Sequence, residues 1–205
     1  KAEKAAREAI RLDPRHAGSY TALGMVEEYR GGRWQAAEDL FRQALALDPY
    51  EPDTLHAYGQ LLGDTGKLKE ALEVRTRLRT VEPFVPVYNF VTGAVMYAAG
   101  QTQAGIRLIE ETTKPDTAQG YRNQFLAAMY AASGRRSEAA DLLAAMPEQN
   151  PFGPSLEEAA AILRSGPDAL SPPGPALVGP LVFVYLFAGA PDRAQRQTGL
   201  YRRLP

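Results

Sequence analysis

Histidine is the side chain that most often moves protons or binds metals, and this chain of 205 residues contains only His16 and His56. His56 follows Asp53 by three positions, so a helix would place both on one face, where an acid could pair with a base. No serine or further acid stands at a spacing that would complete a catalytic set. We therefore interpret His56 as a polar surface residue with a local hydrogen bond. His16 has no companion at a metal-ligand spacing.

Cysteine is absent from the chain, which excludes disulfides, thiolate zinc sites and cysteine nucleophiles. Because histidine is also scarce, few residue types remain that could carry enzymatic chemistry. We expect no catalytic residue, no metal and no cofactor.

A lysine after two glycines could suggest a phosphate-binding loop at Gly59, Gly66 and Lys67. Such a loop has four residues between its glycines and a serine or threonine after the lysine. Here six residues separate the glycines, and Leu68 follows Lys67. We expect an ordinary turn at this place.

One cluster of basic residues could bind phosphate, and it comprises Lys67, Lys69, Arg75, Arg77 and Arg79. The whole chain carries 23 basic and 24 acidic residues, a net charge of −1, which argues against a strongly basic nucleic-acid binder. Charge runs are most often solvated helix faces, and we expect that here for the cluster. The same is expected of the adjacent acids Glu27–Glu28, Glu110–Glu111 and Glu157–Glu158.

Four sets of residues recur along the chain with one period of 34 residues, or 35 at one step. Small residues stand at Gly24, Gly59, Gly93, Ala127 and Ala161, and a second small set stands at Ala37, Ala71, Gly105 and Ala139. Turn residues recur at Gly32, Gly66, Gly100 and Gly134, and prolines at Pro14, Pro49, Pro83 and, two periods later, Pro151. Shared periods of this length are typical of helical repeat proteins.

Each period contains two stretches with apolar residues at helical spacing, separated by the turn glycine. In the clearest period, residues 18–29 form the first stretch and residues 34–47 the second, and Asp48-Pro49 ends it. Small residues opposite one another would let the two helices approach closely, while large residues fill the space beside them.

The pattern resembles that of the tetratricopeptide repeat family. The first full unit matches it at Tyr20, Leu23, Gly24, Gly32, Trp34, Ala37, Phe41, Ala44 and Pro49. The second matches at Leu55, Tyr58, Gly59, Leu62, Gly66, Leu68, Ala71, Leu78 and Pro83, with Arg75 in place of the usual aromatic residue. The resemblance covers about residues 1–165 and implies an all-α, right-handed superhelical solenoid of antiparallel helix pairs.

We expect a half repeat at residues 1–15, repeats at about 17–50, 52–84, 86–119 and 120–153, and the start of a fifth at 154–165. A proline-rich insertion at 166–175 and a degenerate helical pair at 176–205 would follow. Since the first residue is Lys1 and the opening helix has no partner, we interpret the chain as a fragment of a longer bacterial protein with several domains.

In the resembled family, the first helix of each repeat lines a concave groove that holds a peptide or a partner helix. The matching positions here include Met25, Tyr29, His56, Gln60, Phe90, Tyr97, Tyr121 and Gln124. Lysine, arginine and asparagine are absent from these positions, which argues against clamping a chain-terminal carboxylate and against binding RNA. Aromatic and amide side chains suit a peptide with an apolar anchor and exposed backbone amides.

The dense apolar run Leu181 to Ala190 is too short to cross a membrane, so we expect a buried helix there. It could pack against the preceding unit, or await another domain or chain, and the sequence favours neither. In the second case Leu181, Phe183, Leu186 and Phe187 would form the interface.

The function expected from these observations is a non-catalytic scaffold or adaptor for protein–protein interaction. The partner would be a protein or peptide, with no nucleic acid and no membrane insertion. An oligomerisation module, giving a homo-oligomer through the apolar helix, is the alternative, and a regulatory segment of an enzyme is less favoured. The compartment stays open, with the cytoplasm favoured because no signal or membrane segment is found in this fragment.

Overall fold

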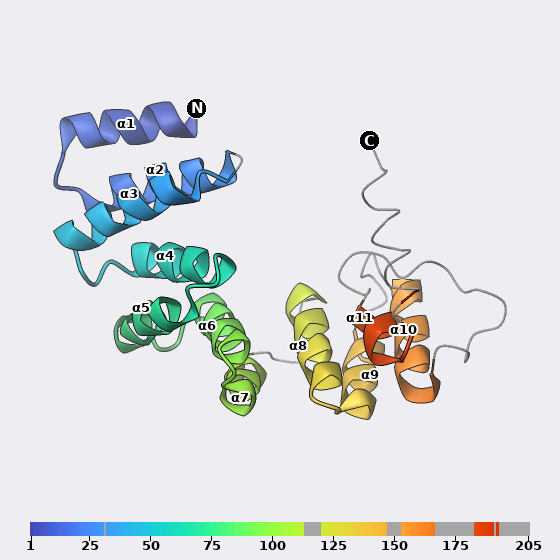
Figure 1. Cartoon of the computed structure of the whole chain (residues 1–205). Coiled ribbons are helices and arrows are strands. Elements are labelled where there is room, and N and C mark those ends of the chain that lie inside the picture. Colours follow the sequence, from blue (N-terminus) through green and yellow to red (C-terminus); the bar gives the residue numbers. More distant parts are fainter. Residues whose placement is uncertain (31, 113–119, 147–152, 167–182, 191, 193–205) are drawn as a thin grey trace. The chain divides into compact units, whose positions relative to one another are not determined.

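The fold was analysed in a computed structural model, which describes all residues except 31, 113–119, 147–152, 167–182, 191 and 193–205. The chain divides into two compact units, Lys1–Thr112 and Thr113–Pro205. Most described residues of both units lie in helices, and none of them lies in a strand (Figure 1). The all-α fold class is therefore confirmed. No described helix combines the length and the apolar character that a membrane crossing needs.

The first unit is a stack of helices packed in chain order (Figure 1). Its helices are α1 (Ala2–Leu12), α2 (Ala17–Tyr29), α3 (Trp34–Leu47), α4 (Pro52–Asp64), α5 (Leu68–Val81), α6 (Pro86–Ala98) and α7 (Thr102–Thr112). The most extensive contacts join α2 to α3, α4 to α5, and α6 to α7. Each pair is joined by a short turn, so its two helices run in opposite directions.

The turn glycines have the backbone conformation that only glycine adopts without strain. Gly32, Gly66 and Gly100 have φ angles of 75°, 79° and 84°, and Gly134 in the second unit has 82°. A residue with a Cβ atom would be strained in this left-handed region. The recurrence of glycine every 34 residues follows from this requirement of the helix turn.

The small residues mark the places where paired helices approach most closely. A Cβ atom built on Gly24 would lie 2.7 Å from a ring carbon of Phe41. One built on Gly93 would lie 2.6 Å from Ile109 and 2.8 Å from the carbonyl oxygen of Gly105. These separations are shorter than real Cβ contacts, so the glycines permit the packing that closes each hairpin.

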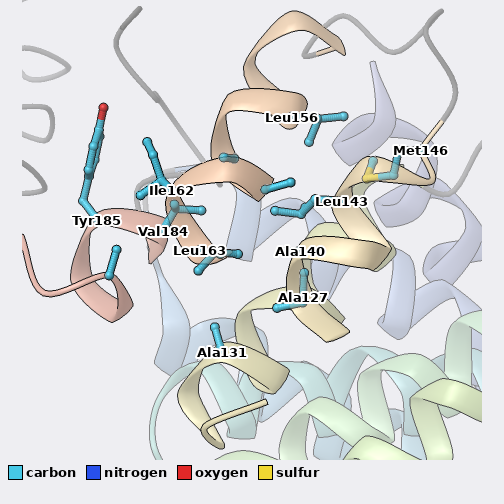
Figure 2. Close-up of a cluster of buried hydrophobic side chains, with 14 residues drawn as sticks. Ala127, Ala131, Ala140, Leu143, Met146, Leu156, Ile162, Leu163, Val184 and Tyr185 are labelled. Atoms are coloured by element: carbon cyan, nitrogen blue, oxygen red, sulfur yellow. The ribbon is translucent and has the colours of Figure 1, made fainter. Parts of the chain in front are cut away.

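The second unit contains α8 (Gly120–Ala132), α9 (Arg136–Ala144), α10 (Gly153–Ser165) and the short α11 (Phe183–Phe187). Its core gathers small residues from α8 and α9 with larger ones from α9, α10 and α11 (Figure 2). Ala127, Ala139 and Leu143 are completely buried there. The small-residue positions thus serve in this unit as they do in the first.

Helix α11 buries one side in the core of its own unit. Val184 and Tyr185 are buried members of the cluster shown in Figure 2, and α11 contacts both α8 and α10. Phe187 is partly buried against the same cluster. Leu186 is half exposed. Of the two interpretations of this apolar run, the described residues therefore favour packing within the unit.

Several expectations fall outside the residues that the structure describes. They concern Leu181, the side chains of Phe183 and Tyr121, the proline-rich insertion beyond residue 166, and the second helix of the degenerate terminal pair.

Candidate functional site

Three of the predicted binding residues in the first unit have side chains at the surface. Tyr29 is 81% exposed and Met25 is 39% exposed, both on α2, and Gln60 on α4 is also exposed. They occupy the first helices of neighbouring pairs, which contact each other. We call the residues at Met25, Tyr29, His56, Gln60 and Tyr97 the first-helix face.

The other predicted positions in this unit are less accessible. His56 on α4 and Tyr97 on α6 are partly buried. Phe90 on α6 is only 8% exposed, so its ring is part of the interior. Phe90 is therefore not available to a partner at the surface without a change in packing.

Gln124 is the predicted position on α8 whose side chain is described, and it is 2% exposed. It belongs to the second unit, whereas the first-helix face lies in the first. We therefore build the candidate site from the first unit alone.

Arg75 corrects the expectation of a solvated basic cluster. Its side chain is completely buried between α4 and α5, although Arg77 and Arg79 on the same helix are exposed. A Cβ atom on Gly59 would lie 2.8 Å from Nε of Arg75, which shows that the arginine fills the place where Phe41 lies over Gly24 in the preceding repeat. The position of the residue in the repeat, rather than its charge, decides its burial.

Arg75 reaches His56 from behind the first-helix face. Nη1 of Arg75 lies 3.0 Å from Nδ1 of His56. A guanidinium can only donate, so Nδ1 must accept, and the ring hydrogen of neutral His56 is on Nε2. His56 therefore has a hydrogen bond, but its partner is Arg75 on the following helix and not, as we expected, a residue close by in the sequence.

Asp53 has a different partner, on the next first helix. The hydroxyl of Tyr88 on α6 donates to Oδ1 of Asp53 at 2.7 Å. The Tyr88 ring also lies against the His56 ring, with centroids 4.7 Å apart. These contacts hold His56 between α5 and α6 and fix the orientation of its ring.

The electrostatics of the site favour a neutral His56. Burial, and then the charge of Arg75, lower the pKa of His56 to about 4, and Asp53 opposes this shift. Burial also lowers the pKa of Arg75 to about 10, and Asp64 and Tyr88 oppose it. At neutral pH the site therefore holds an uncharged imidazole in front of a charged guanidinium.

Acidic residues lie at the ends of the neighbouring first helices. Burial, and then the charge of Asp64, raise the pKa of Glu28 on α2. Two carboxylates that influence each other in this way make this end of α2 and α4 locally negative.

Glu27 corrects the expectation that the adjacent acids are solvated, and Glu38, on which we made no prediction, is buried as well. Glu27 is 5% exposed and lies 2.6 Å from Arg33 across the turn of its own hairpin. Glu38 is equally buried, and its oxygens lie 2.7 Å from both Arg42 and Lys67. Because Lys67 belongs to the following repeat, this ion pair joins neighbouring repeats. We infer a structural role for both.

Nothing in the described part of the molecule resembles a metal centre, since no group of three or more histidine, aspartate or glutamate residues is placed to hold an ion. The arrangement at His56 offers a hydrogen-bond donor and a buried positive charge. It offers no nucleophile beside a base.

Sequence reasoning missed Arg75 as a site residue. The signal was available, because Arg75 occupies the position of the family's aromatic residue opposite Gly59. That position is interior in the neighbouring repeat, as Phe41 shows.

Several solved structures share this fold. YrrB, described as a TPR protein with an unusual peptide-binding site, has a TM-score of 0.67 and 15% identity over 97% of this chain and 100% of its own. TTC0263, a thermophilic TPR protein of Thermus thermophilus, has a TM-score of 0.60 and 21% identity over 89% of this chain and 88% of its own. MamA has a TM-score of 0.58 and 15% identity over 91% and 90%. The chain therefore has the tetratricopeptide-repeat fold, an all-α solenoid of helix pairs, as the sequence resemblance predicts.

Sequence comparison matches only a part of the chain. Protein O-mannosyl-transferase Tmtc1 of Drosophila melanogaster is 36% identical over 76 residues. This match covers 37% of the chain and spans only 9% of the length of that relative. No family model matches the chain.

Proposed function

We propose that this chain is a non-catalytic scaffold for protein–protein interaction, and that the first-helix face binds an extended peptide or a partner helix. The observation that carries the proposal is the exposure of Tyr29, Met25 and Gln60 on adjacent first helices. Large aromatic and thioether side chains at the surface supply much of the energy of protein interfaces, and an amide can pair with a backbone. YrrB, a structural neighbour described as having a peptide-binding site, is consistent with this use of the fold.

The proposal includes the context expected from the sequence. The scaffold is part of a larger multi-domain bacterial protein, and its partner is a protein or peptide rather than a nucleic acid. The near-neutral charge of the chain supports the exclusion of nucleic acid, since a polyanion needs clustered positive charge. Within the first unit, Arg75 is buried and Lys67 is paired with Glu38, which leaves less basic surface than the sequence suggests.

The test is selection of peptides from a random displayed library against the purified chain, followed by calorimetric titration of the selected peptides. The Tyr29→Ala/Gln60→Ala double variant should weaken binding at least tenfold, because truncation of a central aromatic contact costs about 1–2 kcal/mol or more. Tyr50→Ala is the matched control, since Tyr50 is 60% exposed in the loop after α3 and lies outside the first-helix face.

The control variant should bind the selected peptides as the unchanged chain does. Equal affinity of the double variant would overturn the proposed binding face. Failure to select any peptide, together with no binding of helical partners, would overturn the scaffold function itself.

A further inference from the structure

Arg75 is a buried cation without an acidic partner. Nη1 contacts His56, but Nε and Nη2 have no hydrogen-bond partner among the atoms that the structure describes. Asp64 acts on Arg75 through space, and the described residues place no carboxylate within ion-pair distance of it. A buried charge in this state is unfavourable unless another group compensates it. An apolar residue, as at Phe41, would fill the same place without this cost.

The geometry directs the charge of Arg75 toward the first-helix face through His56. Because Nδ1 of His56 accepts from Arg75, the ring presents an Nε2–H donor on its other side. Within the described residues this Nε2–H makes no hydrogen bond, and the ring is only partly buried. A cation behind a neutral imidazole polarises it and strengthens the donor in front.

We propose that His56 Nε2–H binds an aspartate or glutamate side chain of the partner segment, with Arg75 as the buried counter-charge. This inference rests on the proposed function and names the chemistry that the first-helix face recognises. The carboxylate accepts from Nε2, the imidazole accepts from Arg75 at Nδ1, and the imidazole stays neutral throughout. A charge-assisted bond of this kind is shorter and stronger than a neutral one.

The surrounding acids oppose any added anion, and they oppose a dianion more strongly than a monoanion. Asp53, Asp64 and Glu28 lie on the neighbouring first-helix surfaces, and Tyr88 already binds Asp53. Arg75 can balance one added carboxylate, whereas a phosphate dianion would also face these acids. The ligand is therefore a carboxylate monoanion.

The position of His56 points to a side chain rather than to a chain end. Helix α4 contacts α2 on one side and α6 on the other, so a peptide crossing these helices continues beyond His56 in both directions. The cation, moreover, comes from the second helix α5 and not from lysine or asparagine on the first helices. Recognition here differs in both respects from the clamping of a chain-terminal carboxylate.

The experiment titrates small probes and therefore does not depend on finding the natural partner. N-acetylglutamate α-amide carries one side-chain carboxylate, and N-acetylglutamine α-amide is its uncharged counterpart. N-acetylalanine supplies a terminal carboxylate, and inorganic phosphate supplies a dianion. Ring-nitrogen NMR signals of His56 and the Nε–H signal of Arg75 report binding at neutral pH.

The glutamate probe should shift both signals in a saturable way, and the glutamine probe should not. Arg75→Met should weaken binding of the glutamate probe about tenfold or more, because it removes the buried charge that strengthens the Nε2–H donor of His56. Arg79→Met, the same change at an exposed residue one turn along α5, should leave its affinity unchanged. The amide NMR spectrum of each variant verifies that it is folded.

Equal shifts by the glutamine probe, or undiminished affinity in Arg75→Met, would overturn the inference. If N-acetylalanine or phosphate bound more tightly than the glutamate probe, the preferred ligand would be another anion, and the inference would also be overturned. A failure of this inference can be distinguished from a failure of the proposed function. Library peptides that bind the first-helix face but carry no acidic residue, and whose binding does not depend on Arg75, would support the scaffold function and contradict only this inference.

Discussion

The first and second full repeats place different side chains in the same contact. In the first, the ring of Phe41 lies over Gly24, and in the second, the stem and Nε of Arg75 lie over Gly59. Both side chains are completely buried. The contact of Phe41 with Gly24 is an ordinary apolar contact between paired helices. The contact of Arg75 with Gly59 instead places a charge without an acidic partner close to the first-helix face. The difference shows that a repeat can keep its packing geometry with either an apolar or a charged side chain over the small residue.

Removing Phe41 should have the largest effect on stability. Phe41→Ala should lower the free energy of unfolding by about 3–5 kcal/mol, because a fully buried ring leaves a cavity. The ring also contacts Tyr58, with centroids 6.1 Å apart. Urea unfolding followed by circular dichroism measures the change, and exposed Tyr50→Ala should shift it by less than about 0.5 kcal/mol. Similar losses in both variants would mean that the buried ring of Phe41 contributes no more to stability than an exposed tyrosine.

Replacing Arg75 by an apolar residue should raise the free energy of unfolding rather than lower it. Arg75→Met should raise the free energy of unfolding by about 1–3 kcal/mol, since methionine fits the same channel and needs no counter-charge. Arg79→Met, at the surface, should change it by less than about 0.5 kcal/mol. The same unfolding measurement applies, and a net loss of stability in Arg75→Met would show that the guanidinium is satisfied in the free protein.

Replacing Gly24 and Gly59 by alanine compares how well the opposing side chains, Phe41 and Arg75, accommodate an added methyl group. Gly24→Ala meets the Phe41 ring at 2.7 Å and should cost about 1–3 kcal/mol. Gly59→Ala meets the Arg75 side chain at 2.8 Å, which can move, and alanine favours the helix by about 1 kcal/mol over glycine. Gly59→Ala should therefore lower the stability less than Gly24→Ala does. Thermal unfolding of both variants measures the two losses. A larger loss in Gly59→Ala would mean that the Arg75 side chain is held rigidly.

His56 contributes a pH dependence to the stability of the folded chain. Its pKa of about 4 lies below the ordinary value of 6.5, so between these pH values the unfolded chain binds a proton that the folded chain does not. This contribution to stability is complete above pH 6.5 and is lost as the pH falls toward 4. The groups facing His56 are Asp53 on its own helix, Arg75 on α5 and Tyr88 on α6.

Two variants isolate the pH effect of His56. His56→Gln should remove this part of the fall in stability between pH 6.5 and 4, which is seen as a difference from the unchanged chain in unfolding experiments. Arg75→Met should raise the pKa of His56 toward its ordinary value, as followed by NMR titration, because it removes a neighbouring positive charge. A pKa that does not move in Arg75→Met would mean that burial alone produces the shift.

The elements that local chemistry determines could be predicted from the sequence. Left-handed turns require glycine, and close helix contacts require small residues, so Gly66 and Gly93 predicted the turn and the contact where the structure has them. The burial of Phe90 and the one-sided packing of α11 could not be predicted in the same way. They depend on which neighbours cover a side chain, and an apolar residue suits both an interior and an interface.

The candidate site was predictable only in part. His56 and Gln60 were found because repeat positions carry over from one unit to the next. Arg75 was misjudged because its charge suggested solvent, while its place in the repeat required burial. The link between Arg75 and His56 joins residues on two helices, and only the packing of α4 against α5 brings them together.

The left-handed turns have a practical consequence for engineering. At Gly66 and Gly100, an added Cβ atom would have no other atom within 4 Å, so the space around these turns is open. Exposed turns of this kind are where chains accept inserted sequence most readily. A fluorescent reporter or an affinity tag grafted between Gly100 and Gln101 would enter at an open turn next to Tyr97, and would therefore report on the end of the first-helix face that α6 provides.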